Sequence, residues 1–138
     1  MAKPSIYTVN TSQTTVETNN VLPLGNVVKR PCNKNIMLSG SNTINIIDKY
    51  ENYYDIVVSA TFTAADAGDV TLTLLQNNVP VIGGAATQTI TTADTQVASI
   101  SFKSTIRASA GCNVDQIQIL NAGIPATFSN ISINIIKN

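Results

Sequence analysis

Apolar and polar residues alternate with a period of two along most of the chain after residue 26. The clearest case is the segment YYDIVVSATFT at 53–63, where one face carries Tyr54, Ile56, Val58, Ala60 and Phe62. The same alternation at 70–74, 98–106, 117–119 and 131–135 predicts further core positions at Val70, Leu72, Leu74, Ala98, Ile100, Phe102, Ile106, Ile117, Ile119, Ile131, Ile133 and Ile135. No segment keeps a helical period, and turn residues recur about every ten positions, which predicts an all-β sandwich or barrel.

One turn is specified by its residues. Asn77 and Asn78 separate two apolar runs, and asparagine tolerates the positive φ that a tight hairpin turn requires. Pro80 follows in the returning segment VPVIGG and lacks a backbone N–H, so that segment is predicted to be an edge strand.

The first 26 residues differ in composition from the rest. They are rich in Thr and Asn, contain Pro4 and Pro23, and have only short apolar stretches around Ile6, Tyr7 and Val9. We interpret residues 1–26 as an extended N-terminal arm and residues 27–138 as the folded domain.

Charge is sparse. Charged residues make up 12% of the chain, eight of each sign, whereas soluble domains average about 25%. Nucleic-acid binding is not expected, because it needs clustered Lys and Arg. The sequence contains no apolar run long enough for a membrane span or a signal peptide, so we expect synthesis in a cytoplasm and no membrane partner.

The chemical inventory argues against an enzyme. The chain has no histidine, which excludes Ser-His-Asp and Cys-His arrangements. Asp48, Glu51 and Asp55 form the densest carboxylate cluster, but they lie in a polar loop that leads into a strand. We expect no catalytic residues and no cofactor.

Metal binding has little support either. Asp66 and Asp69 are too few to predict a calcium site, because calcium takes six to eight oxygen ligands. Cys32 and Cys112 are not in a metal-binding pattern, and whether they are reduced or bridged stays open.

Four apolar residues lie on faces that are otherwise polar: Val57, Leu75, Leu120 and Ile136. Several such residues in a chain with so little charge predict a buried subunit interface. The alternative is that the strand registers are wrong by one residue near bulges.

The order of these segments resembles a known family. YYDIVVSATFT, DVTLTLLQNNVPV, QVASISFKSTI, IQIL and FSNISINII together resemble the jelly roll of complement globular heads and tumour necrosis factor, over about Gly25 to Asn138. The resemblance implies an antiparallel jelly-roll β-sandwich and a compact homotrimer. It also implies that Val57, Leu120 and Ile136 line the three-fold axis.

Relatives of this family include proteins that tip spore filaments and decorate virus heads. The sequence has no collagen-like stalk and no secretory signal, so we expect a virion role: a phage capsid decoration or head-fibre subunit on the capsid surface. Ile6, Tyr7 and Val9 would then dock the arm onto the major capsid protein. The alternative is a carbohydrate- or receptor-binding module on a phage or on a bacterial spore or cell surface, with a host-surface glycan as its partner, for which the absence of Trp is unfavourable.

Overall fold

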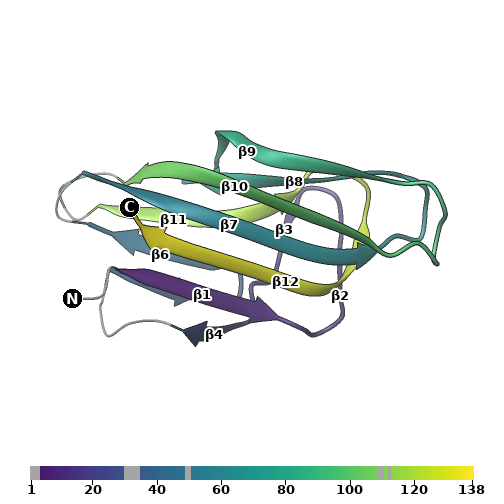
Figure 1. Cartoon of the computed structure of the whole chain (residues 1–138), viewed down its shortest axis with the longest axis horizontal. Helices are drawn as coiled ribbons and strands as arrows, with labels where there is room; N and C mark the ends of the chain where they lie inside the picture. Colours follow the sequence, from purple (N-terminus) through teal and green to yellow (C-terminus); the bar gives the residue numbers. More distant parts are fainter. Residues whose placement is uncertain (1–3, 30–34, 49–50, 109–110, 112) are drawn as a thin grey trace.

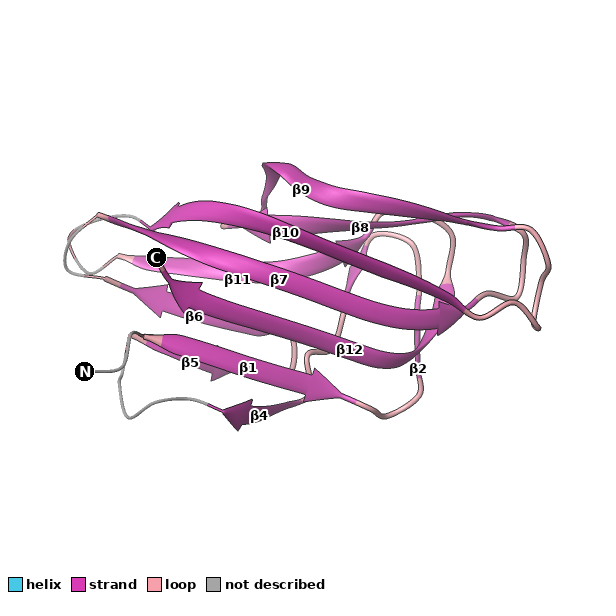
Figure 2. Cartoon of the chain, viewed as in Figure 1, coloured by secondary structure: helices cyan, strands magenta, loops and turns pink. Residues whose placement is uncertain are grey.

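The computed structural model describes residues 4–29, 35–48, 51–108, 111 and 113–138. The strands form two antiparallel sheets that pack face to face (Figure 1). Figure 2 shows that the described connections between strands are loops and turns. The predicted all-β antiparallel sandwich is therefore confirmed. The described residues form no helix that could cross a membrane.

The first sheet, called here the β12 sheet, has the strand order β10-β7-β12-β1-β4, and β2 pairs with the beginning of β12. Its strands are β1 (Ser5–Asn10), β2 (Thr14–Val16), β4 (Asn26–Lys29), β7 (Asn52–Thr63), β10 (Ala98–Ala108) and β12 (Ala126–Lys137). In Figure 1 this sheet is the front layer, and the beginning of β1 and the end of β12 lie at the same end of the sandwich.

The second sheet, called the β11 sheet, has the strand order β5-β6-β11-β8-β9, and β3 pairs with β11. Its strands are β3 (Asn20–Val21), β5 (Ile36–Ser39), β6 (Thr43–Ile47), β8 (Gly68–Gln76), β9 (Val79–Ile90) and β11 (Val114–Asn121). Among the described strands, consecutive strands stay in one sheet at β1–β2, β5–β6 and β8–β9, and the chain changes sheet at every other connection.

The core lies between the sheets and includes the residues that the alternation predicts, together with others such as Leu22, Ile44 and Phe128. All of the predicted inward positions are buried except Phe102, which is half-buried at its margin. Phe62 and Phe128 meet across neighbouring strands with ring centroids 5.3 Å apart in a tilted arrangement, which is favourable for aromatic pairs.

The predicted hairpin turn is also confirmed. Asn77 and Asn78 have φ values of 54° and 66° and join β8 to β9. Two successive residues with positive φ form the turn whose twist suits a two-residue hairpin. β9 is an edge strand, as Pro80 predicts, because it pairs only with β8.

The N-terminal segment is not a separate arm. β1 lies between β12 and β4, with Ile6 opposite Ile135 and Val9 opposite Asn26. Ile6 is fully buried in the core. Gly25 has φ +78° and its Cα faces the backbone of Val9 and Asn10 so closely that a Cβ would overlap them, which lets β4 return beside β1.

Candidate functional site

The outer face of the β12 sheet brings two of the predicted interface residues together. Val57 of β7 lies opposite Asn134 of β12, and Ile136 lies opposite Asp55 one row further along. The two apolar side chains are therefore diagonal neighbours on adjacent strands. Tyr7 of β1 extends the first row, because it pairs with Asn134.

These residues form an apolar surface, called here the Val57 face: Tyr7, Tyr53, Val57 and Ile136. Tyr53, Val57 and Ile136 are exposed by 51%, 42% and 43%. Two charged residues border this face: Asp55 lies opposite Ile136, and Lys103 lies opposite Val57. Asp55 accepts a 2.8 Å hydrogen bond from the Thr105 hydroxyl. Beyond Val57 the outward residues become small and polar, with Ser59 between Ser101 and Ser132.

Leu120 is not part of the Val57 face. It lies on β11, in the other sheet, opposite Val21 and Thr73, and points away from the core. Leu75, the fourth misplaced apolar residue, is buried, with 7% exposure. The structure therefore does not bring Leu120 onto the surface that Val57 and Ile136 share, and a position of these residues on a three-fold axis stays a prediction. Val57, Leu120 and Ile136 each point away from the core, as the alternation predicts. However, β11, which contains Leu120, belongs to the other sheet.

The three predicted docking residues also separate. Ile6 faces the core and is inaccessible while β1 stays in the sheet. Tyr7 and Val9 point outward and are half-buried. Beside them, Val27 and Val28 of β4 are exposed by 41% and 61%. The β1–β4 edge is thus the part of the N-terminal region that could meet a partner.

The candidate carboxylates do not converge on a common site. Asp48 is buried and accepts hydrogen bonds from the Tyr54 hydroxyl at 2.8 Å and from the Asn52 amide at 3.0 Å. Its carboxylate is also 3.4 Å from Lys137 Nζ. Glu51 instead pairs with Arg107 at 2.9 Å on the surface. Asp55 is bound to Thr105, so each carboxylate has a structural partner.

Asp48 also sets the state of its neighbour. Burial, followed by the hydrogen bond to Asp48 and the negative charges of Asp48 and Asp115, raises the pKa of the Tyr54 phenol well above its ordinary value. Tyr54 is therefore a permanent donor near neutral pH, which suits a structural role.

No group of three or more metal-ligating side chains occurs in the part of the chain that the structure describes. Asp69 accepts a 2.7 Å hydrogen bond from the Thr89 hydroxyl, an ordinary cross-strand contact. Cys32 and Cys112 lie outside the described residues, so the question of their pairing is not addressed.

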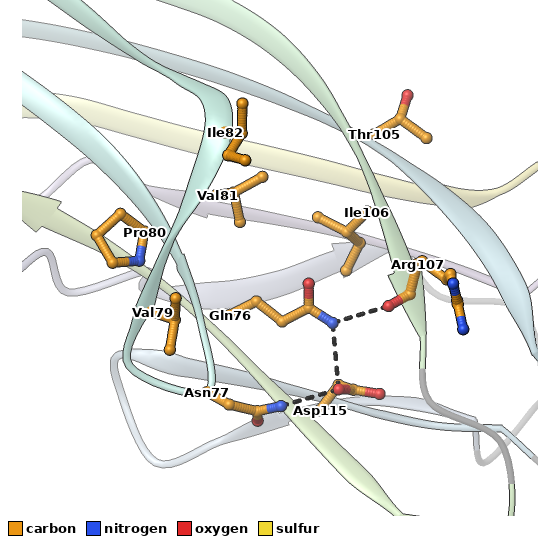
Figure 3. Close-up of a pocket in the computed structure, with 10 residues that line it drawn as sticks. All are labelled: Gln76, Asn77, Val79, Pro80, Val81, Ile82, Thr105, Ile106, Arg107 and Asp115. Carbon is orange, nitrogen blue, oxygen red and sulfur yellow. Dashed lines mark hydrogen bonds between the residues drawn. The ribbon is translucent and has the colours of Figure 1, made fainter.

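A cleft of about 440 Å³ lies between the beginning of β9 and the end of β10 (Figure 3). One side is aliphatic, with Val79 exposed by 63% and Ile82 by 99%. On the other side, Gln76 Nε2 donates to the Arg107 carbonyl oxygen at 2.9 Å and to Asp115 at 3.1 Å. The remaining lining residues are Asn77, Pro80, Val81, Thr105 and Ile106.

The sequence did not predict this cleft, although it held one signal. The register of β9 against β8 is interrupted: Thr73 faces Ala85, but Leu75 faces Pro80. Residues 81–84 therefore have no partner in the β8 register, and Val81 and Ile82 line the cleft together with Val79 and Pro80. The pair Gly83-Gly84 inside a strand marks such an irregularity, and Gly83 has φ +78°.

Comparison with known proteins identifies the fold. No family model matches the chain, and no curated protein matches its sequence. The globular domain of zebrafish complement 1qA protein superposes with a TM-score of 0.66 and 12% identity, over 99% of this chain and 100% of that one. The PRD1 vertex protein P5 superposes with a TM-score of 0.64 and 13% identity, over 99% of this chain and 98% of that one. The predicted jelly roll and its resemblance to complement globular heads are thereby confirmed as a likeness of fold.

Proposed function

We propose that this chain is a non-enzymatic structural protein of a virion, a capsid decoration or head-fibre subunit that assembles as a homotrimer and is made in the host cytoplasm. The observation that carries the proposal is the Val57 face, an exposed apolar surface on a fold shared with a viral vertex protein.

The composition of the Val57 face supports subunit contact. Val57, Ile136 and Tyr53 gather on one end of a sheet, whereas the other outward residues of that sheet are mainly Ser, Thr and Asn, apart from the neighbouring Asp55, Lys103 and Arg107. Interface cores are depleted of charge and enriched in aromatic residues, and clustered exposed apolar residues on soluble proteins mark interaction sites. We therefore assign the homotrimer contact to this face and leave Leu120 out of it.

The absence of convergent chemistry among the described residues supports a structural role. Asp48, Glu51 and Asp55 each bind a separate partner, and a general acid–base pair would have to face a common substrate.

Capsid docking is assigned to the β1–β4 edge. Of the predicted docking residues, Tyr7 and Val9 stay in this proposal because they point outward. We add Val27 and Val28, which are exposed on the neighbouring strand. Tyr7 is also part of the Val57 face, so Val9 and Val28 are the residues that test docking without disturbing the trimer.

The native mass of the purified protein tests the trimer. We expect three times 14.6 kDa. Val57→Lys should reduce the mass to that of the monomer, because it places a charge in an apolar contact. Val114→Lys is the matched control, since Val114 is similarly exposed, 45% against 42%, but lies on the other sheet. A wild-type monomer, or a Val57→Lys protein that stays trimeric, would contradict the assignment.

The virion role has its own test. Mass spectrometry of purified virus particles from cells that carry the gene should detect the chain as a particle component. A Val9→Lys, Val28→Lys double variant should keep the trimeric mass and be lost from the particles. Particles that lack the wild-type chain would exclude the virion role, and particles that retain the double variant would exclude docking through this edge.

A further inference from the structure

Two side chains of opposite charge flank Val57 on the outer face of the β12 sheet. Lys103 of β10 lies directly opposite Val57 and is exposed. Asp55, two residues before Val57 on β7, is half-buried and lies opposite Thr105. Lys103 and Asp55 are therefore diagonal neighbours on adjacent strands, a relation that places their Cα atoms about 7–8 Å apart. Both charges lie at the margin of the apolar Val57 face.

Neither charge is neutralised by an ion pair within its own chain. Asp55 accepts its 2.8 Å hydrogen bond from the Thr105 hydroxyl, which is neutral. The described residues form two ion pairs, Arg107 with Glu51 and Lys137 with Asp48. The two cations nearest to Lys103 on this sheet therefore already have carboxylate partners. Lys103 and Asp55 are the charges at this end of the sheet that stay available for a partner.

A second copy that packs on Val57 would cover both charges, because each of them is a neighbour of Val57 or Ile136. Removing a charge from water costs free energy, and a buried charge without a partner is strongly destabilising. Asp55 and Lys103 carry equal and opposite charges. The face therefore holds both members of an ion pair, and a second copy can bring them together.

The symmetry of a three-fold ring permits this ion pair between copies. The contacts of a ring are head-to-tail, so each contact joins two different parts of the same face. Rotation about the axis moves no atom along the axis. The heights of Lys103 and of Asp55 of the partner subunit therefore differ by no more than their separation within one chain. That separation is about 7–8 Å between Cα atoms, which a long side chain can span.

We propose that Lys103 of each copy forms an ion pair with Asp55 of the partner subunit, one pair at each contact of the trimer. This inference rests on the proposed trimer and names the charges that select its packing. The apolar residues of the Val57 face supply the buried area. The ion pairs determine which parts of two faces meet, because complementary charges contribute more to specificity than to affinity.

Single charge reversals test the pair by native mass spectrometry of the full chain. Lys103→Glu and Asp55→Lys each place like charges at every contact, so each should raise the concentration for half assembly at least about tenfold. Lys29→Glu is the matched control and should assemble like the wild type. Lys29 is exposed and lies opposite Tyr7 on the same face, but β1 and β12 separate its strand from that of Val57.

Mixing the two reversed variants distinguishes pairing between copies from pairing within one chain. The Lys103→Glu chain carries carboxylates at both positions, and the Asp55→Lys chain carries cations at both. In a mixed ring, two of the three contacts join opposite charges, whereas all contacts repel in a ring of one variant. With one variant ¹⁵N-labelled, mixed trimers should be detected at concentrations where each variant alone is monomeric. Their formation also shows that both variants are folded.

Three results would overturn this inference. One is wild-type assembly of both single reversals, and another is dissociation of Lys29→Glu to the same extent as Lys103→Glu, which would indicate a response to net charge alone. The third is a mixture in which both variants stay monomeric, which would indicate that Lys103 and Asp55 pair within one chain. Failure of the proposed trimer is distinguishable, because the wild-type chain would then be monomeric or Val57→Lys would stay trimeric.

Discussion

Tyr54 connects the end of β7 to a buried carboxylate. Its phenol donates to Asp48, which Asn52 and Lys137 also contact. A buried charge that loses one donor is left partly unsatisfied, so Tyr54→Phe should lower the free energy of unfolding by about 1–3 kcal/mol at neutral pH, measured by urea unfolding. An unchanged midpoint would mean that the hydrogen bond contributes nothing net.

The same tyrosine should make the free energy of unfolding depend on pH in the alkaline range. Because its pKa is raised in the folded state, unfolding releases a proton once the pH exceeds the ordinary tyrosine pKa of about 10. The stabilisation of the folded state that comes from the protonated Tyr54 phenol is complete below that pH, and it is lost as the pH rises further. Wild-type stability should then fall by up to about 1.4 kcal/mol per pH unit more steeply than that of Tyr54→Phe. Parallel curves would show that the phenol titrates normally.

Single residues also show what a sequence can predict. The positive φ of Asn77 and Asn78 follows from residue type, and the burial of Ile131, Ile133 and Ile135 follows from alternation. The partners of Asp48 could not be predicted, because they come from β7 and β12, and their approach depends on how the strands are arranged in space.

At the scale of elements, β1 is the strand that the alternation of apolar and polar residues did not predict. Its inward positions are Ile6, Thr8 and Asn10 and its outward ones include Tyr7 and Val9, so apolar residues occur on both faces and the alternation is obscured. Thr8 is fully buried, and its hydroxyl has no hydrogen-bond partner among the described residues. A polar residue at a core position removes the pattern from which a strand is recognised.

Ile6→Ala tests whether β1 is part of the folded body. The substitution leaves a cavity under a fully buried side chain, so we expect a loss of about 2–5 kcal/mol in unfolding free energy. Val9→Ala, on the outward side of the same strand, should cost less than about 1 kcal/mol. If both variants were as stable as the wild type, β1 would be a detachable arm.

β9 and β11 show two features that could not be predicted from the sequence. The cleft depends on an interrupted register, and the position of Leu120 depends on which sheet contains β11. Both properties are set by pairing between distant segments, whereas alternation reports only which face of its own strand a residue occupies.

At the scale of the whole molecule, the low charge makes a prediction about assembly. The chain has eight positive and eight negative residues, and the Val57 face is mostly apolar. Salt screens charge pairs but strengthens or spares apolar burial. The native mass should therefore be unchanged between roughly 0.05 and 1 M sodium chloride. Dissociation at high salt would indicate an interface held by ion pairs.

The pairing of β1 with β12 also has a consequence for how the protein is made. β1 occupies a position between β12 and β4, so its longer neighbour is the strand at residues 126–137. During translation, residues 5–10 emerge well before residues 126–137 and must wait until that neighbour has been made. The sheet cannot close on the ribosome strand by strand, and its exposed edges in the interval are where a chaperone would be needed.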